Sequence, residues 1–112
     1  MKRVLTVSLL ATALLGSVAH ASDADRQESA EKRLRGCIAA GASTAPKASL
    51  ANAIQHVRAF CGPQIGDVAE IRVSEATEGL SGEEAEEARV RTIRELNNEI
   101  AYAVANFTGL IP

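Results

Sequence analysis

The chain of 112 residues contains two cysteines, Cys37 and Cys61, separated by twenty-four positions. Three roles are open for Cys37: a lipid-modified anchor, a reactive thiol, or half of a structural disulfide. Its flanking stretch RLRGC loosely resembles a bacterial lipoprotein box. The spacing of the pair is far from the C-x-x-C motif of redox enzymes. The choice therefore depends on the compartment in which the chain folds, because disulfides persist only where conditions are oxidising.

The first twenty-one residues have the pattern of a secretory signal peptide. A basic pair, Lys2-Arg3, precedes an apolar run over 4–18 that is shorter than the roughly twenty residues needed to span a bilayer. The stretch AHA at 19–21 offers small residues where a signal peptidase reads them, which predicts cleavage between Ala21 and Ser22. We expect a periplasmic or secreted protein without a stable membrane anchor after cleavage.

Export favours the disulfide. A lipoprotein cysteine directly follows the apolar run, whereas Cys37 lies nineteen residues beyond Val18 and behind a strongly polar segment. An oxidising envelope pairs two cysteines most simply with each other. In the chain-entropy model a Cys37–Cys61 bond contributes about 3.5 kcal/mol to stability. A disulfide between two chains stays open as the alternative.

Composition sets the size and the charge of the mature domain. Residues 22–112 suffice for a single small domain, in which ten basic residues face fourteen acidic ones. This acidic balance argues against nucleic acid or an anionic lipid surface as the partner. Large apolar residues are few and alanine supplies much of the rest, so the predicted core is thin. A covalent bond or a partner surface would help such a core to stay folded.

Apolar residues at helical spacing predict an all-α fold, a small bundle of three to four helices with one disulfide linking the ends of helices one and two. The expected helices cover approximately 24–40, 46–61, 67–79 and 82–108. Residues 67–80 are ambiguous, because EIRVSE also alternates as a short strand does.

Local signals predict where these helices begin and end. Gly41 is expected to follow the first helix, and Gly62-Pro63 to stop the second. Asp67 and Ser81, each three residues before a glutamate, are expected to form capping boxes. Gly109 stands where a helix C-cap favours glycine, which would let Leu110 fold back on the last helix.

The disulfide limits how the first two helices can pack. In a simple hairpin turning near Ala45, Cys37 would face residue 53, which is about 12 Å along the helix from Cys61. That distance is too long for a disulfide. We therefore expect residues 41–47 to run extended, so that the end of the second helix returns to the end of the first.

The ionisable residues indicate no catalytic centre, metal site or cofactor. His56, the one histidine remaining after cleavage, falls off the apolar stripe of its helix and is interpreted as a surface residue. The acidic residues of 83–87 occupy a first helical turn, where the helix dipole favours them, and Glu86 and Glu87 are spaced to pair with Arg89 and Arg91. The basic residues of 31–35 are interpreted as a solvated face.

We expect a non-enzymatic protein that acts by protein–protein contact, as an inhibitor, adaptor or chaperone, with an unidentified partner or with itself. The alternative is a carrier of a small apolar ligand in a pocket between the second and fourth helices, and an enzyme of unknown type is the third possibility. The expected partner or ligand surface consists of Val57, Phe60, Leu96, Ile100 and Phe107.

Overall fold

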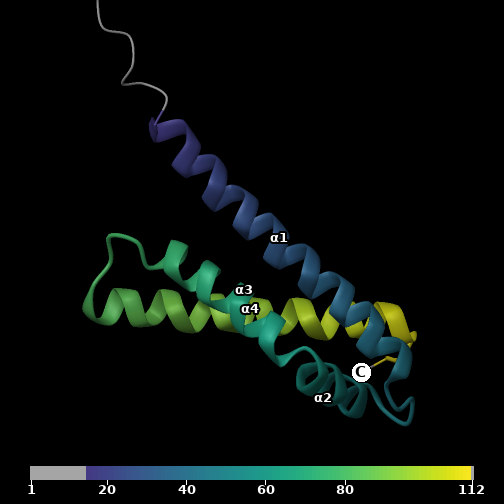
Figure 1. Cartoon of the computed structure of the whole chain (residues 1–112). Helices are drawn as coiled ribbons and strands as arrows, with labels where there is room; N and C mark the ends of the chain where they lie inside the picture. The colour runs from purple at the N-terminus through teal and green to yellow at the C-terminus, as the bar shows by residue number, and fades with distance from the viewer. Residues whose placement is uncertain (1–14, 112) are drawn as a thin grey trace, which may run out of the picture.

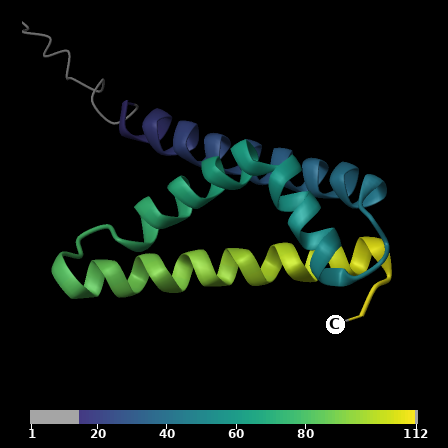
Figure 2. The same cartoon turned by 90° about the horizontal axis from the view of Figure 1, so that it is seen from below.

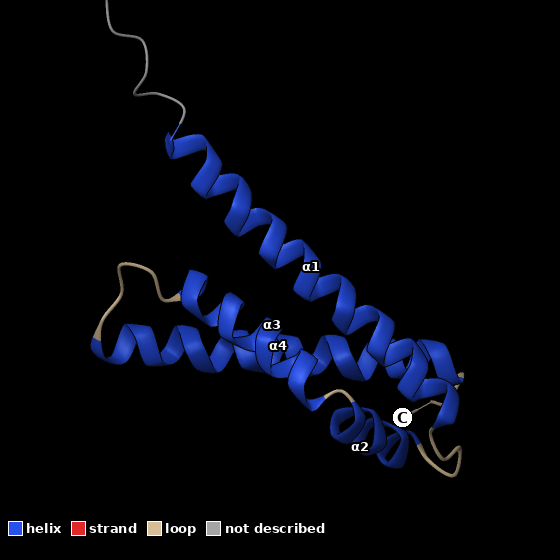
Figure 3. Ribbon diagram, viewed as in Figure 1, coloured by secondary structure: helices blue, strands red, loops and turns tan. Residues whose placement is uncertain are grey.

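The computed structural model describes residues 15–111, with side-chain surroundings from residue 23 onward. The first fourteen residues of the predicted leader lie outside this range. The described chain consists of four α-helices without a strand (Figures 1 and 3), which confirms the all-α prediction. The helices are α1 (Leu15–Thr44), α2 (Leu50–Phe60), α3 (Gly62–Ala76) and α4 (Gly82–Thr108). None of them is long and apolar enough, within the described residues, to cross a membrane.

The two long helices, α1 and α4, approach each other toward their C-terminal ends and diverge toward their N-terminal ends (Figure 1). Between them, α2 and α3 form a bent pair whose bend lies next to α1 (Figure 2). Both α2 and α3 pack against α1 and α4. The bundle is therefore held together by two long outer helices and a short bent pair that connects them.

The core follows one apolar stripe on each helix, as the periodicity predicts. Its buried side chains include Leu34 and Ile38 of α1, Val57 of α2, Val68 of α3 and Leu96 of α4. Alanines fill many of the remaining buried positions, among them residues 30, 42, 53 and 88. The small side chains let the helices approach closely, which explains how so few large apolar residues can form a core.

The disulfide joins Cys37 and Cys61 of the same chain, with the two Cα atoms 5.8 Å apart. Cys61 is the C-cap residue of α2 and also the N-cap residue of α3, and it is fully buried. The bond thus fixes the bend between α2 and α3 onto α1. The predicted pairing is confirmed.

The prediction that the first helix stops at Gly41 and that residues 41–47 run extended is wrong. Helix α1 continues to Thr44, and Gly41 is buried inside it. A Cβ atom at this position would lie 3.1 Å from Cδ1 of Phe60, so the glycine lets side chains of α2 pack closely against α1. The expected start near Pro46 is also wrong, because α2 begins after Ser49, whose hydroxyl accepts a hydrogen bond of 3.1 Å from the Asn52 N–H.

The break at Gly62-Pro63 is confirmed, but it separates two helices without an intervening loop. Helix α3 begins at Gly62 with Pro63 in its first turn. The N–H groups of this turn have no acceptor within the helix, so the missing N–H of proline costs no helical hydrogen bond there. Asp67 consequently lies inside α3 and is not a cap. The segment 67–80, whose alternation also fits a short strand, is helical as far as Ala76.

The ends of α4 match the sequence signals in part. Ser81 is the N-cap residue, but its side chain makes no capping hydrogen bond, so the predicted capping box does not form. Gly109 has a left-handed backbone with φ of 72°, and its N–H donates to the carbonyl of Ala105 at 2.9 Å. The C-cap is therefore confirmed, and the half-buried Leu110 packs against the core beyond it.

Candidate interaction surface

The five residues predicted to form a partner or ligand surface do not lie on one surface. Val57, Leu96 and Ile100 are buried in the core, so they are packing residues. Leu96 and Ile100 also line a small cavity of about 220 Å³, which lies between α4 and residues of α1 and α3 and includes no residue of α2 in its lining. Phe60 and Phe107 are exposed over more than half of their surface. The predicted surface is thus corrected to two exposed phenylalanines on different helices.

An apolar groove lies instead between the start of α2 and the chain segment that follows α4. Its volume is about 590 Å³, and it has no charged residue in its lining. The large lining side chains are Leu50, Ile54, Leu110 and Ile111, and small residues at 48, 49, 51 and 109 complete it. Ile111 is 86% exposed, the highest value of any large apolar residue in the described chain.

Two local signals in the sequence create this groove. The Ser49 cap starts α2 so that Leu50 and Ile54 lie one turn apart on the same side of the helix. At the other wall, the left-handed Gly109 reverses the chain after α4. The Leu110 N–H donates to the hydroxyl of Thr108 at 3.3 Å, which helps to hold the tail in place.

Phe60 forms a separate aromatic cluster at the end of α2. Its ring lies parallel to that of His56, with the ring centroids 6.2 Å apart, and it covers Gly41 of α1. The Nε2 atom of His56 lies 3.2 Å from the hydroxyl of Thr44. His56 is half-buried. Its contact with Thr44 joins α2 to the last turn of α1.

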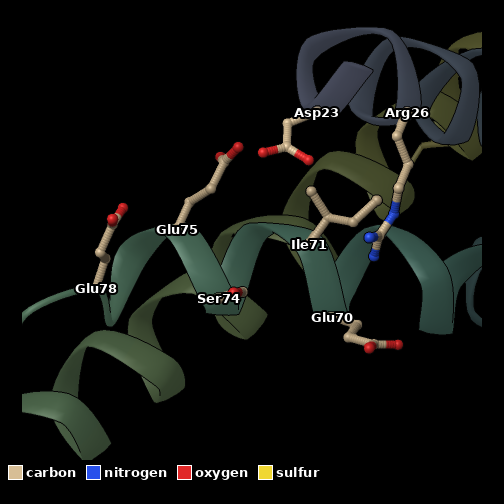
Figure 4. Close-up of a pocket in the computed structure, with 7 residues that line it drawn as sticks. All are labelled: Asp23, Arg26, Glu70, Ile71, Ser74, Glu75 and Glu78. Carbon is tan, nitrogen blue, oxygen red and sulfur yellow. The ribbon is translucent and has the colours of Figure 1, made fainter. Parts of the chain in front are cut away.

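A polar cleft of about 510 Å³ opens between the first part of α1 and the second half of α3 (Figure 4). Asp23 and Arg26 point from α1 toward α3, and Ile71 lies between the two helices, whereas Glu70 points away (Figure 4). One contact crosses the cleft, from Gln27 Nε2 to Glu75 Oε2 at 3.4 Å. No group of His, Cys, Asp or Glu side chains in the described residues is arranged to hold a metal ion.

Arg72 of α3 joins three helices through two carboxylates. Its guanidinium donates two hydrogen bonds to Glu31 of α1, at 2.8 and 3.0 Å, and a third to Glu99 of α4 at 3.0 Å. The hydrogen bonds to Glu31 are the largest cause of a raised Arg72 pKa. Arg72 and Glu31 are mostly buried, while Glu99 is open to solvent. This triad of Arg72, Glu31 and Glu99 holds α1, α3 and α4 together, and its charged groups are paired with one another.

The charged residues of α4 behave largely as the sequence indicates. Glu86 and Arg89 form the expected pair, with an Oε1 to Nη2 distance of 2.6 Å. This hydrogen bond lowers the pKa of Glu86 and raises that of Arg89. The second expected pair, Glu87 with Arg91, is not among the ion pairs of the described residues. Both acidic positions remain exposed to solvent.

No family model, curated protein or solved structure matches the chain. The residues of the chain itself are therefore the guide to its function.

The apolar groove is the feature that the sequence indicated least directly. Leu50 and Ile54 belong to the stripe that contains the buried Val57, and the pattern alone does not show that the stripe is uncovered at its N-terminal end.

Proposed function

We propose that the protein is exported and acts without catalysis, by contact between its apolar groove and a partner protein, as an inhibitor, adaptor or chaperone. One observation carries this proposal: the groove between α2 and the C-terminal tail is lined by large apolar side chains, and Ile111 stands almost fully exposed at its edge. Phe107, 60% exposed in the last turn of α4, adds a large apolar side chain near this end of the chain.

The chemistry of the groove indicates what the partner presents. Removing apolar surface from water is favourable by about 25 cal/mol per Å², and part of this gain offsets the cost of association. The groove has no charge in its lining to pair with a charged ligand, and burying an unpaired charge there would be costly. A matching partner therefore inserts one or two apolar side chains, as interface anchors do at the centre of other protein contacts.

Export is supported by two features of the chain. The leader pattern over 1–21 predicts cleavage between Ala21 and Ser22. An intramolecular disulfide is compatible with an oxidising compartment, since such bonds are rare in the cytosol. The mass of the protein isolated from the cell envelope tests this part, because a chain that begins at Met1 would contradict it.

Site-specific photo-crosslinking tests the contact. A photoreactive residue at Ile111 should capture a defined protein, whereas one at Tyr102, which is 76% exposed on α4 outside the groove, should not. Ala51→Glu places a charge in the groove lining without removing a core side chain and should abolish the adduct. Ala59→Glu, at an exposed alanine of the same helix outside the groove, is the matched control. Equal capture by the photoreactive residue at positions 111 and 102 would contradict the proposal. Capture at position 111 that survives Ala51→Glu would contradict it as well.

A small apolar ligand is the second candidate for the same groove. Its volume lies in the range of about 300–1,000 Å³ that is usual for small-molecule sites. Native mass spectrometry separates the two possibilities. A carrier retains extra mass that gentle activation removes and that Ala51→Glu abolishes, while a contact protein shows a partner chain or a second copy. A bare monomer that also gives no crosslink would argue against both.

A further inference from the structure

The two cysteines of the disulfide differ in their exposure to solvent. Cys61 lies at the bend between α2 and α3 and has no exposed surface. Cys37 is only half-buried on α1. Its neighbours Gly36 and Ala40 are exposed, and a Cβ atom at Gly36 would meet nothing within 4 Å. Of the two cysteines, Cys37 is therefore the one that is partly open to solvent.

We propose that Cys37 is the site at which the folded protein exchanges its disulfide with an external thiol. The incoming thiolate forms a new bond to the sulfur of Cys37, and the bond between Cys37 and Cys61 breaks. Its electron pair leaves on the sulfur of Cys61, which takes up a proton. Attack on Cys61 would require the incoming thiol to enter the core among Val57 and the other buried residues.

The position of the leaving group makes this exchange reversible, because Cys61 stays at the bend between α2 and α3 after the bond breaks. The two cysteines sit on elements that hold their Cα atoms 5.8 Å apart in the disulfide form. The released Cys61 thiol therefore stays close enough to attack the mixed disulfide on Cys37 and to restore the original bond. The modified form accumulates only when this return is blocked.

Mapping of mixed disulfides in the wild-type protein tests the proposal. The oxidised protein is incubated with reduced glutathione in native buffer, its free thiols are blocked rapidly, and the sites are identified by peptide mass spectrometry. We expect at least tenfold more glutathione on Cys37 than on Cys61, and a ratio near one in urea above the unfolding midpoint. Equal amounts in native buffer, or adducts formed only in urea, would overturn the proposal.

A matched pair of variants gives a second measurement. Cys61→Ala leaves a single thiol at position 37, and Cys37→Ala leaves one at position 61. With oxidised glutathione in native buffer, the Cys61→Ala variant should be modified at least tenfold faster, and denaturant should remove the difference. If either variant fails to fold, the wild-type mapping decides alone.

Discussion

Replacing Gly41 by alanine tests how closely α1 and α2 pack. Glycine inside a helix costs about 0.5–1 kcal/mol relative to alanine, so the substitution is stabilising wherever the new Cβ finds space. At Gly41 that atom would lie 3.1 Å from Cδ1 of Phe60 and 3.4 Å from Cγ2 of Val57. Overpacking costs about 1–3 kcal/mol, and the half-exposed Phe60 ring can shift, which places the cost near 1 kcal/mol. We therefore expect Gly41→Ala to leave stability unchanged or slightly lower.

Gly36→Ala is the matched control in the same helix. Gly36 is exposed, has no positive φ, and offers open space to a Cβ atom. This variant should gain the full helical preference, about 0.5–1 kcal/mol. The measurement is urea denaturation of the oxidised protein followed by circular dichroism at 222 nm. An unchanged slope with denaturant shows that only the stability has changed.

A double-mutant cycle identifies the cause of the difference. When Phe60→Ala removes the ring, Gly41→Ala should become stabilising by about the same amount as Gly36→Ala, because the remaining contact to Val57 is an ordinary one. The coupling between positions 41 and 60 is then about 1 kcal/mol. If Gly41→Ala stabilises the protein as much as Gly36→Ala in the presence of Phe60, the close approach of the two helices is refuted.

Three further sets of variants test the disulfide, the Arg72 triad and the helix caps. Replacing both Cys37 and Cys61 by alanine should lower the free energy of unfolding by about 3.5 kcal/mol, as expected for a separation of 24 residues, and thermal melts should show a fall above 10 °C; a loss below about 1 kcal/mol would contradict the argument. Arg72→Met should cost about 1–3 kcal/mol in urea denaturation, and Arg72→Lys should restore little, because lysine cannot bond bidentately. Ser49→Ala should cost about 1 kcal/mol, and Ser81→Ala clearly less, since only Ser49 makes a capping hydrogen bond; equal losses would show that the caps are not distinct.

The fold was predictable where one short stretch of sequence decides the structure. The helical spacing of apolar residues and the left-handed Gly109 are signals of this kind, and both are confirmed. The pairing of Cys37 with Cys61 followed from there being only two cysteines. The prediction that the first helix stops at Gly41 is wrong for a physical reason. Glycine is a helix-stop signal when only its own segment is considered, but at this position it makes room for the Phe60 ring. Such contacts depend on the partner helix.

The candidate surface was harder to predict, because a stripe shows which face of a helix is apolar and not which part of that face is covered. Leu96 and Ile100 lie on the α4 stripe and are buried, whereas Phe107 continues the same stripe and is exposed. The Arg72 triad was equally inaccessible, since its carboxylates are 41 and 27 positions away in the sequence.

Within residues 23–44 of α1, whose side-chain surroundings are described, the contacts to the other helices are concentrated from Ala30 onward. Glu31 bonds to Arg72, Cys37 bonds to Cys61, and the first buried residue among 23–111 is Ala30. Residues 23–26 are exposed, and one long hydrogen bond from Gln27 is the nearest link to α3. A signal peptidase cuts an extended segment, and the predicted bond between Ala21 and Ser22 lies within α1 as the structure has it. Among the residues whose side-chain surroundings are described, the buried positions of α1 begin at Ala30, beyond the predicted cleavage site. We therefore expect cleavage between Ala21 and Ser22 to leave the contacts of Ala30, Glu31 and Cys37 in place.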